Sequence, residues 1–161
     1  MTGGIDIRAA RAGDEALVLS FVRELAEYER LAHEVVATEE AVSTALFGPN
    51  PRVFCDLAHS RGEPAGFALW IYNFSTFLAK PGIYLEDLFV RPQFRGRGIG
   101  KALLANLAQR AIAEDCGRLE WWVLDWNTPS IEFYKSLGAK AMNEWTVFRV
   151  TGDALTKLAK T

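Results

Sequence analysis

The sequence contains few of the residues that bind metal ions or act as nucleophiles. It has two histidines, His33 and His59, and two cysteines, Cys55 and Cys116, and they form no HExxH or CxxC motif. It has no GxSxG motif, the strained turn that carries the nucleophilic serine of many hydrolases. We therefore interpret both histidines as surface or turn residues, and we expect no metal cofactor and no serine or cysteine nucleophile.

The sequence also lacks a strong charge bias and a long apolar segment. Its 161 residues carry a net charge of −2, with acidic and basic residues mixed along the chain, which argues against a nucleic-acid partner. No apolar stretch reaches the roughly 20 residues of a membrane span, and no signal-peptide pattern is present. We expect a cytoplasmic protein with free thiols and no membrane partner. Because 50% of the residues are hydrophobic, a single domain over residues 1–161 can bury a sizeable core.

The hydrophobic periodicity predicts an α/β protein. Alternation predicts a strand over 5–10, and runs rich in strand-forming residues predict strands over 52–59, 64–74, 84–90, 119–126 and 141–150. Helical spacing, caps and breakers predict helices from Asp14 to the ELAEYER segment (24–30), from Thr38 to Gly48, from the glycine-rich stretch to Gly117, from Thr128 to Gly138 and over 154–160. Because strands and helices alternate in the second half, we expect helices that cover a mixed central sheet.

The segment QFRGRGIG, residues 93–100, joins a predicted strand to a predicted helix. Its glycines leave main-chain N–H groups open at a helix start, which carries about half a positive charge. Arg95, Arg97 and Lys101 add positive charge, which favours a diphosphate over a neutral ligand. A plain flexible turn is the alternative. The segment fits neither the Walker loop, since position 102 is alanine, nor the dinucleotide fingerprint, which needs a third glycine.

The spacing Arg95-x-x-Gly98-x-Gly100, preceded by YLEDLFVRPQF, resembles the pyrophosphate loop of the Gcn5-related N-acetyltransferase (GNAT) superfamily. The segment WNTPSIEFYKSLGA (126–139) is similar to a second cofactor segment of that family, in which an asparagine precedes a helix carrying FY. With ELAEYER and YLEDLFV added, the chain resembles the diamine (spermidine/spermine) and thialysine acetyltransferase branch along nearly its whole length. The resemblance implies a GNAT fold with about six to seven strands, acetyl-CoA as cosubstrate, and a homodimer.

An amine acceptor arrives protonated and must lose a proton before it attacks a thioester. Glu86 and Asp87 interrupt an apolar strand, and since adjacent strand residues point to opposite faces, we expect one of them to face a site. The resemblance implies Glu86 as the base acting through water, with Asp87 as a possible helper. An edge-strand carboxylate paired with an arginine is the structural alternative. The resemblance also implies Tyr134 as the acid that protonates the CoA thiolate, whereas an aromatic on such a helix is otherwise a core residue.

The resemblance further implies how acetyl-CoA is bound. The pantetheine arm would lie along strand 84–90 like an added strand, with a main-chain N–H near Leu88 or Phe89 stabilising the thioester oxygen. The glycine loop would hold the diphosphate, and Asn127 would hydrogen-bond the cofactor arm. The implied cofactor-binding residues are Leu88, Phe89, Val90, Arg95, Gly96, Arg97, Gly98, Ile99, Gly100, Lys101, Asn127, Ser130 and Tyr134.

For the acceptor, Tyr28 and Glu29 match a pair that looks substrate-binding in the same branch, so they join Glu86 and Asp87 as implied substrate-binding residues. Glu29 would pair with a distal ammonium, although a solvated helix end is the alternative. The turn HSRGEP (59–64) is short, and AMNEWTV (141–147) carries one acid, unlike the polyamine-acetylating members. A lysine-like or short amine therefore stands beside a small polyamine. A CoA-binding regulator without turnover, and an acetyltransferase of a protein lysine or N-terminus, remain alternatives.

Overall fold

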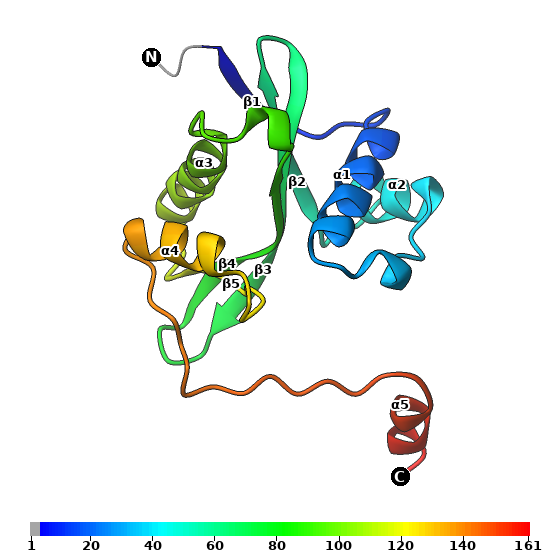
Figure 1. Ribbon diagram of the computed structural model, residues 1–161. Helices are drawn as coiled ribbons and strands as arrows, with labels where there is room; N and C mark the ends of the chain where they lie inside the picture. The colour runs from blue at the N-terminus through cyan, green and yellow to red at the C-terminus, as the bar shows by residue number, and fades with distance from the viewer. Residues whose placement is uncertain (1–3) are drawn as a thin grey trace. The chain divides into compact units, whose positions relative to one another are not determined.

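The structure is a computed structural model that describes residues 4–161. The chain divides into two compact units, the first ending at Trp122 and the second comprising Val123–Thr161. Within residues 4–161, every strand belongs to the first unit, whereas the second contains helices and extended chain (Figure 1).

A five-stranded sheet forms the centre of the first unit. Its strands are, in order across the sheet, β1 (Ile5–Ala9), β2 (Phe54–Ser60), β3 (Glu63–Ser75), β4 (Lys80–Val90) and β5 (Leu119–Trp121). Neighbouring strands are antiparallel except β4 and β5, which are parallel. The predicted α/β class with a mixed sheet is therefore confirmed.

The predicted hairpin between β2 and β3 has a two-residue turn. Arg61 and Gly62 both take left-handed conformations, with φ of 50° and 84°. Positive φ at both positions is the type I′ turn, whose twist matches that of the flanking strands, and glycine adopts this conformation without strain. The local sequence thus fixes the start of β3, on which the register of β4 depends.

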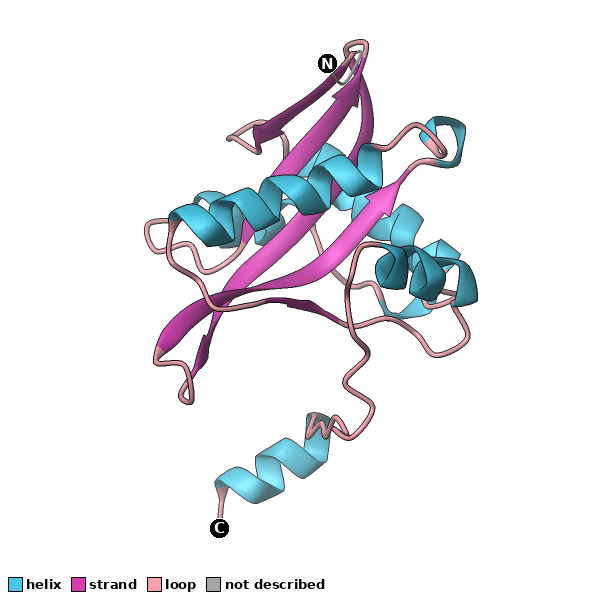
Figure 2. Ribbon diagram, turned by 90° about the vertical axis from the view of Figure 1, so that its left-hand side faces the viewer, coloured by secondary structure: helices cyan, strands magenta, loops and turns pink. Residues whose placement is uncertain are grey.

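Helices cover both faces of the sheet. The helices α1 (Glu15–Tyr28) and α2 (Glu39–Phe47) lie on one face, and α3 (Ile99–Ala113) lies on the other (Figure 1). Figure 2 shows α3 running across the strands that it covers. Two short 3-10 segments, η1 (Ala32–Glu34) and η2 (Pro92–Phe94), follow α1 and β4 respectively.

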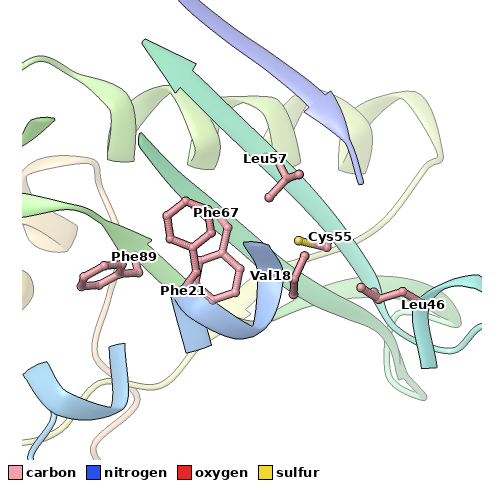
Figure 3. Close-up of a cluster of buried hydrophobic side chains, with 7 residues drawn as sticks. All are labelled: Val18, Phe21, Leu46, Cys55, Leu57, Phe67 and Phe89. Carbon is pink, nitrogen blue, oxygen red and sulfur yellow. The ribbon is translucent and has the colours of Figure 1, made fainter. Parts of the chain in front are cut away.

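The core under α1 fixes that helix against the sheet. Its buried residues are Val18, Phe21, Leu46, Cys55, Leu57, Phe67 and Phe89 (Figure 3). The rings of Phe21 and Phe67 stack with centroids 5.2 Å apart, and burying each such ring contributes about 1.5–3 kcal/mol. Because Phe89 belongs to the same cluster, α1 and β4 are held in one relative position.

Two predicted strands are shortened or absent. Of 119–126 only Leu119–Trp121 is a strand, and 141–150 forms none, so the sheet has five strands and not six or seven. A strand exists where its backbone pairs with a neighbour, and no strand within residues 4–161 pairs with 141–150. The apolar side chains of this segment are exposed, Phe148 by 91%.

The second unit contains α4 (Thr128–Ser136) and α5 (Gly152–Ala159). The N-cap of α4 is Asn127 and not the predicted Thr128, because the Asn127 side chain accepts a hydrogen bond from the Ser130 N–H at 3.4 Å. Gly138 ends α4 with a φ of 90°, as predicted. In residues 4–161, no helix has the length and apolar character needed to cross a membrane.

Candidate active site

A β-bulge lies at the centre of β4. Leu85 pairs with Trp70 of β3 and Asp87 pairs with the adjacent Leu69, so Glu86 has no opposite residue. In a regular strand residues 85 and 87 would share a face, but the extra residue places them on opposite faces. Asp87 therefore joins the face that Phe89 buries against α1. The bulge therefore interrupts, at Glu86, the regular alternation on which the sequence argument relied.

Asp87 is the most strongly perturbed carboxyl group at this bulge. Burial, followed by the negative charges of Glu86 and Glu29, raises its pKa to about 7. Burial also raises the pKa of Glu29, whereas the side chain of Glu86 is exposed. The structure thus brings together three carboxylates that the sequence singled out, two from β4 and one from the end of α1.

The end of α1 holds Glu29 in place. Glu29 is the C-cap residue, and the Leu31 and Arg30 N–H groups donate to the carbonyls of Ala26 and Glu27 at 2.8 and 3.1 Å. This is the Schellman arrangement, which normally has glycine in the left-handed position. Here Arg30 occupies it, with a φ of 60°. A non-glycine residue there costs about 1 kcal/mol, and the tight turn directs the chain away immediately after Glu29.

The outer edge of β4 is open next to these carboxylates. β5 pairs with Ile83, Tyr84 and Leu85 only, and no strand within residues 4–161 pairs with that edge from Glu86 to Val90. An extended ligand can add to such an edge through main-chain hydrogen bonds. The predicted contact residues Leu88, Phe89 and Val90 lie on this stretch, with the Phe89 side chain buried in the core.

The glycine-rich segment forms an open turn into α3. Gly96 and Gly98 are left-handed, with φ of 75° and 82°, and a Cβ at either would meet no atom within 4 Å. Gly98 is the N-cap of α3 and supplies no capping side chain. The N–H groups of Ile99, Gly100 and Lys101 therefore stand at a helix start, where phosphate binds readily. The Ile99 side chain is 1% exposed, so this residue offers its main chain alone.

The arginines of this segment stack on aromatic rings. The Arg95 guanidinium lies 5.1 Å from the Tyr28 ring centroid and 5.5 Å from that of Phe89. Its Nε donates a hydrogen bond to the Val90 carbonyl at 2.9 Å. Arg97 lies over the Phe94 ring at 5.6 Å. Sequence reasoning treated these side chains as diphosphate ligands and missed the stacking, because no local pattern indicates it.

Three predicted residues of the second unit share one side of α4. Asn127, Ser130 and Tyr134 are spaced by three and four residues, as neighbours on a helix surface are. Asn127 is 6% exposed, and the Tyr134 ring packs beside Phe133 with centroids 5.6 Å apart. The local fold thus groups the residues that the sequence related to the coenzyme arm and the acid.

Sequence reasoning missed Tyr84. This residue pairs with Ile71, and so shares the face of Leu69 and Asp87. Burial and the charges of Glu86, Asp87 and Glu120 raise its pKa to about 12. The YLED motif contains the residue, but only the bulge shows that it shares a face with Asp87.

The family model described as "Acetyltransferase (GNAT) family" matches residues 18–139. The chain belongs to the GNAT family. This acetyltransferase is 39% identical to the thialysine N-epsilon-acetyltransferase of Sus scrofa, over 95% of its own length and 96% of that protein. It is 33% identical to an L-ornithine N5-acetyltransferase of Arabidopsis thaliana, over 96% and 87%.

A solved structure confirms the GNAT fold of this acetyltransferase. An integron cassette protein from the mobile metagenome of V. cholerae superimposes with a TM-score of 0.81 and 31% identity, over 98% of this chain and 99% of that protein. The predicted enzyme class, an N-acetyltransferase, is confirmed. GNAT acetyltransferases use acetyl-CoA as cosubstrate. Among residues 4–161, no three His, Cys, Asp or Glu side chains are grouped so that they could hold a metal ion.

Proposed function

We propose that this acetyltransferase transfers the acetyl group of acetyl-CoA directly to a primary amine of a small lysine-like or polyamine substrate. The observation that carries the proposal is the Asp87 carboxyl at the β4 bulge, whose pKa is raised to about 7 by burial and by Glu86 and Glu29. The names of the relatives support this class, because thialysine and ornithine are both amino acids with a terminal amine.

The charge of the site favours a cationic acceptor. Glu29, Glu86 and Asp87 repel one another, and an ammonium among them relieves that repulsion. A diamine-like molecule offers a second positive group, which Glu29 binds while the reacting nitrogen lies near β4. Tyr28 supplies a half-exposed ring beside the carbon chain of the acceptor. A neutral acceptor would not relieve the repulsion among the three carboxylates and would form no ion pair with Glu29.

The reaction follows as a direct transfer. A carboxylate removes a proton from the ammonium, through one water molecule, and the free amine attacks the thioester carbon. A C–N bond forms, the attacking nitrogen loses its second proton to water, and the C–S bond breaks. The CoA thiolate takes a proton, for which we propose the Tyr134 phenol as donor. A main-chain N–H on the open edge of β4, near Leu88 or Phe89, stabilises the oxyanion that forms between these steps.

Two carboxylates are candidates for the base. The family resemblance implies Glu86, which the bulge leaves exposed to water. The geometry favours Asp87, because a base works best when its pKa lies near the working pH. We assign Asp87 as the base and Glu86 as the group that orients the water and the ammonium. If the roles are reversed, Glu86→Gln lowers kcat far more than Asp87→Asn.

The coenzyme part of the proposal uses main chain more than side chains. We propose that the N–H groups from Gly96 to Lys101 hold the diphosphate and that the open edge of β4 at Leu88–Val90 receives the pantetheine arm. Asn127 and Ser130 contact the same arm. The left-handed glycines and the uncapped helix start support this assignment.

The test is release of free CoA thiol from acetyl-CoA with a panel of acceptors. The panel contains thialysine, lysine, ornithine, spermidine, a lysine peptide and a blank without amine. We expect thiol release with a free diamine-like molecule, and a loss of at least about a hundredfold in kcat for Asp87→Asn and Tyr134→Phe, the low end of the typical range for removing an acid or base. Glu63→Gln is the matched control, since Glu63 is an exposed acid at the start of β3.

The alternatives give different outcomes in the same assay. A coenzyme-binding regulator shows calorimetric binding of CoA with no thiol release for any acceptor. A protein acetyltransferase prefers the peptide over every free amine. Either result refutes the proposed substrate class.

We also propose that the protein is a cytoplasmic homodimer. The second unit exposes a run of large apolar side chains, namely Met142, Trp145, Val147, Phe148, Val150, Leu155 and Leu158. A run of this size in water usually marks an interface with a partner. A second copy of the chain is the partner that we propose, with these residues at its contact surface.

A further inference from the structure

Arg95 connects two parts of the first unit that are far apart in sequence. It follows η2 and directly precedes the left-handed Gly96, the first residue of the proposed diphosphate loop. Its side chain points elsewhere. The guanidinium lies between the rings of Tyr28, the last residue of α1, and Phe89 of β4, at 5.1 and 5.5 Å from their centroids.

The contacts of Arg95 fix its position from three directions. Its Nε–H bond to the Val90 carbonyl, 2.9 Å long, holds the side chain along the end of β4. The buried Phe89 ring forms one wall, and the partly exposed Tyr28 ring forms the other. A cation that lies over the face of an aromatic ring is attracted to that ring by a cation–π interaction. Because Glu29 follows Tyr28 directly, whatever holds the Tyr28 ring also restrains the Glu29 carboxylate.

We infer that Arg95 is a positioning residue for the amine side of the active site, holding the Tyr28–Glu29 end of α1 against β4. This inference rests on the proposed function and changes the expected role of one residue. The main chain at Arg95 leads into the proposed diphosphate loop, whereas its side chain governs acceptor binding. The sequence resemblance had placed the whole residue on the coenzyme.

Steady-state kinetics and calorimetry separate the two roles. In Arg95→Met, which keeps an unbranched apolar side chain, we expect the KM of the amine to rise at least threefold. The dissociation constant of CoA, measured by calorimetry, should stay within twofold. Lys101→Met is the contrasting variant, because Lys101 is exposed in the first turn of α3. It should weaken CoA binding and leave the KM of the amine nearly unchanged.

A double-mutant cycle tests the contact itself. Tyr28→Leu removes the ring, and its effect on kcat/KM for the amine should not multiply with that of Arg95→Met. We expect the loss of kcat/KM in the double variant to be about two- to fivefold smaller than the product of the losses in the two single variants. This factor corresponds to the energy of an exposed cation–π contact. Arg95→Lys keeps the positive charge but cannot form the Nε hydrogen bond to Val90. Its kcat/KM for the amine should therefore lie between that of Arg95→Met and that of the native protein.

The inference is overturned if Arg95→Met weakens CoA as Lys101→Met does while the KM of the amine is unchanged, or if the two single effects multiply. Thermal unfolding of each variant checks the fold. If Arg95→Met does not fold, Arg95→Lys and Tyr28→Leu carry the same comparison. Failure of the proposed function is a separate result, since the unaltered protein would then release no thiol with any amine.

Discussion

Replacing Asp87 by asparagine should make the protein more stable at alkaline pH while abolishing most of its activity. The pKa of Asp87 is about 7 in the folded protein, against an ordinary value of 3.8. The folded state therefore binds this proton more tightly than the unfolded state does. The stability that Asp87 contributes is complete below pH 3.8 and is lost as the pH rises through about 7.

The size of the effect follows from the two pKa values. Between about pH 5 and about pH 8, linkage removes about 2–3 kcal/mol of unfolding free energy from the native protein through this one carboxyl. Asparagine has almost the same shape and no charge, so the Asp87→Asn variant is spared this loss. Because Glu29 and Glu86 are present in both proteins, their own titration largely cancels in the difference.

Urea unfolding of both proteins at the two pH values measures this difference. The unfolding free energy of the variant minus that of the native protein should be about 2–3 kcal/mol larger at about pH 8 than at about pH 5. The Glu63→Gln control should show no such change with pH. A difference between the proteins that is the same at both pH values would mean that Asp87 ionises at its ordinary pKa, and the case for Asp87 as the base would collapse.

Three further predictions follow from the same geometry. Glu29→Gln removes a negative charge that raises the pKa of Asp87, so the acidic limb of the kcat/KM profile should move to lower pH; an unmoved limb contradicts the assigned base. Gly98→Ala puts a side chain at a φ of 82° with open space around it, so backbone strain alone should cost about 1 kcal/mol in urea unfolding and weaken CoA binding. Gly98→Asn should lose less stability than Gly98→Ala, because asparagine tolerates a left-handed conformation. Equal losses in the two variants would mean that the added side chain, and not backbone strain, is the cause. Phe148→Asp should convert the proposed dimer to monomer in light scattering, whereas Ala12→Asp, at an exposed position outside the apolar run, should not.

Most elements of the fold could be predicted because short-range signals determine them. Thr38 caps α2 by accepting a hydrogen bond from the Ala41 N–H at 3.1 Å, and a residue of this type before an apolar period is a reliable helix start. Arg61 and Gly62 likewise fix the β2–β3 hairpin. The open turn at Gly96 and Gly98 before α3 could be predicted as well, since its glycines act through local backbone geometry.

The features that could not be predicted depend on partners distant in sequence. Whether Glu86 has an opposite residue depends on how β3 pairs, so β4 alone does not reveal the bulge. The pKa of Asp87 is raised first by burial and then by the charges of Glu86 and Glu29, and α1 brings Glu29 close through core packing around Phe21 and Phe89. Residues 141–150 are rich in strand-forming apolar residues, but composition does not supply a strand partner.

The unpaired Glu86 has a consequence for changes in chain length. Every other residue of β4, from Lys80 to Val90, has a counterpart on β3. Deleting Glu86 would therefore leave all remaining pairs in their present register, whereas deleting a residue away from the bulge would shift by one position every pair between that residue and Glu86. A chain shortened by this single residue would keep a straightened sheet, and comparing it with Glu86→Gln would separate the effect of the bend from that of the carboxylate.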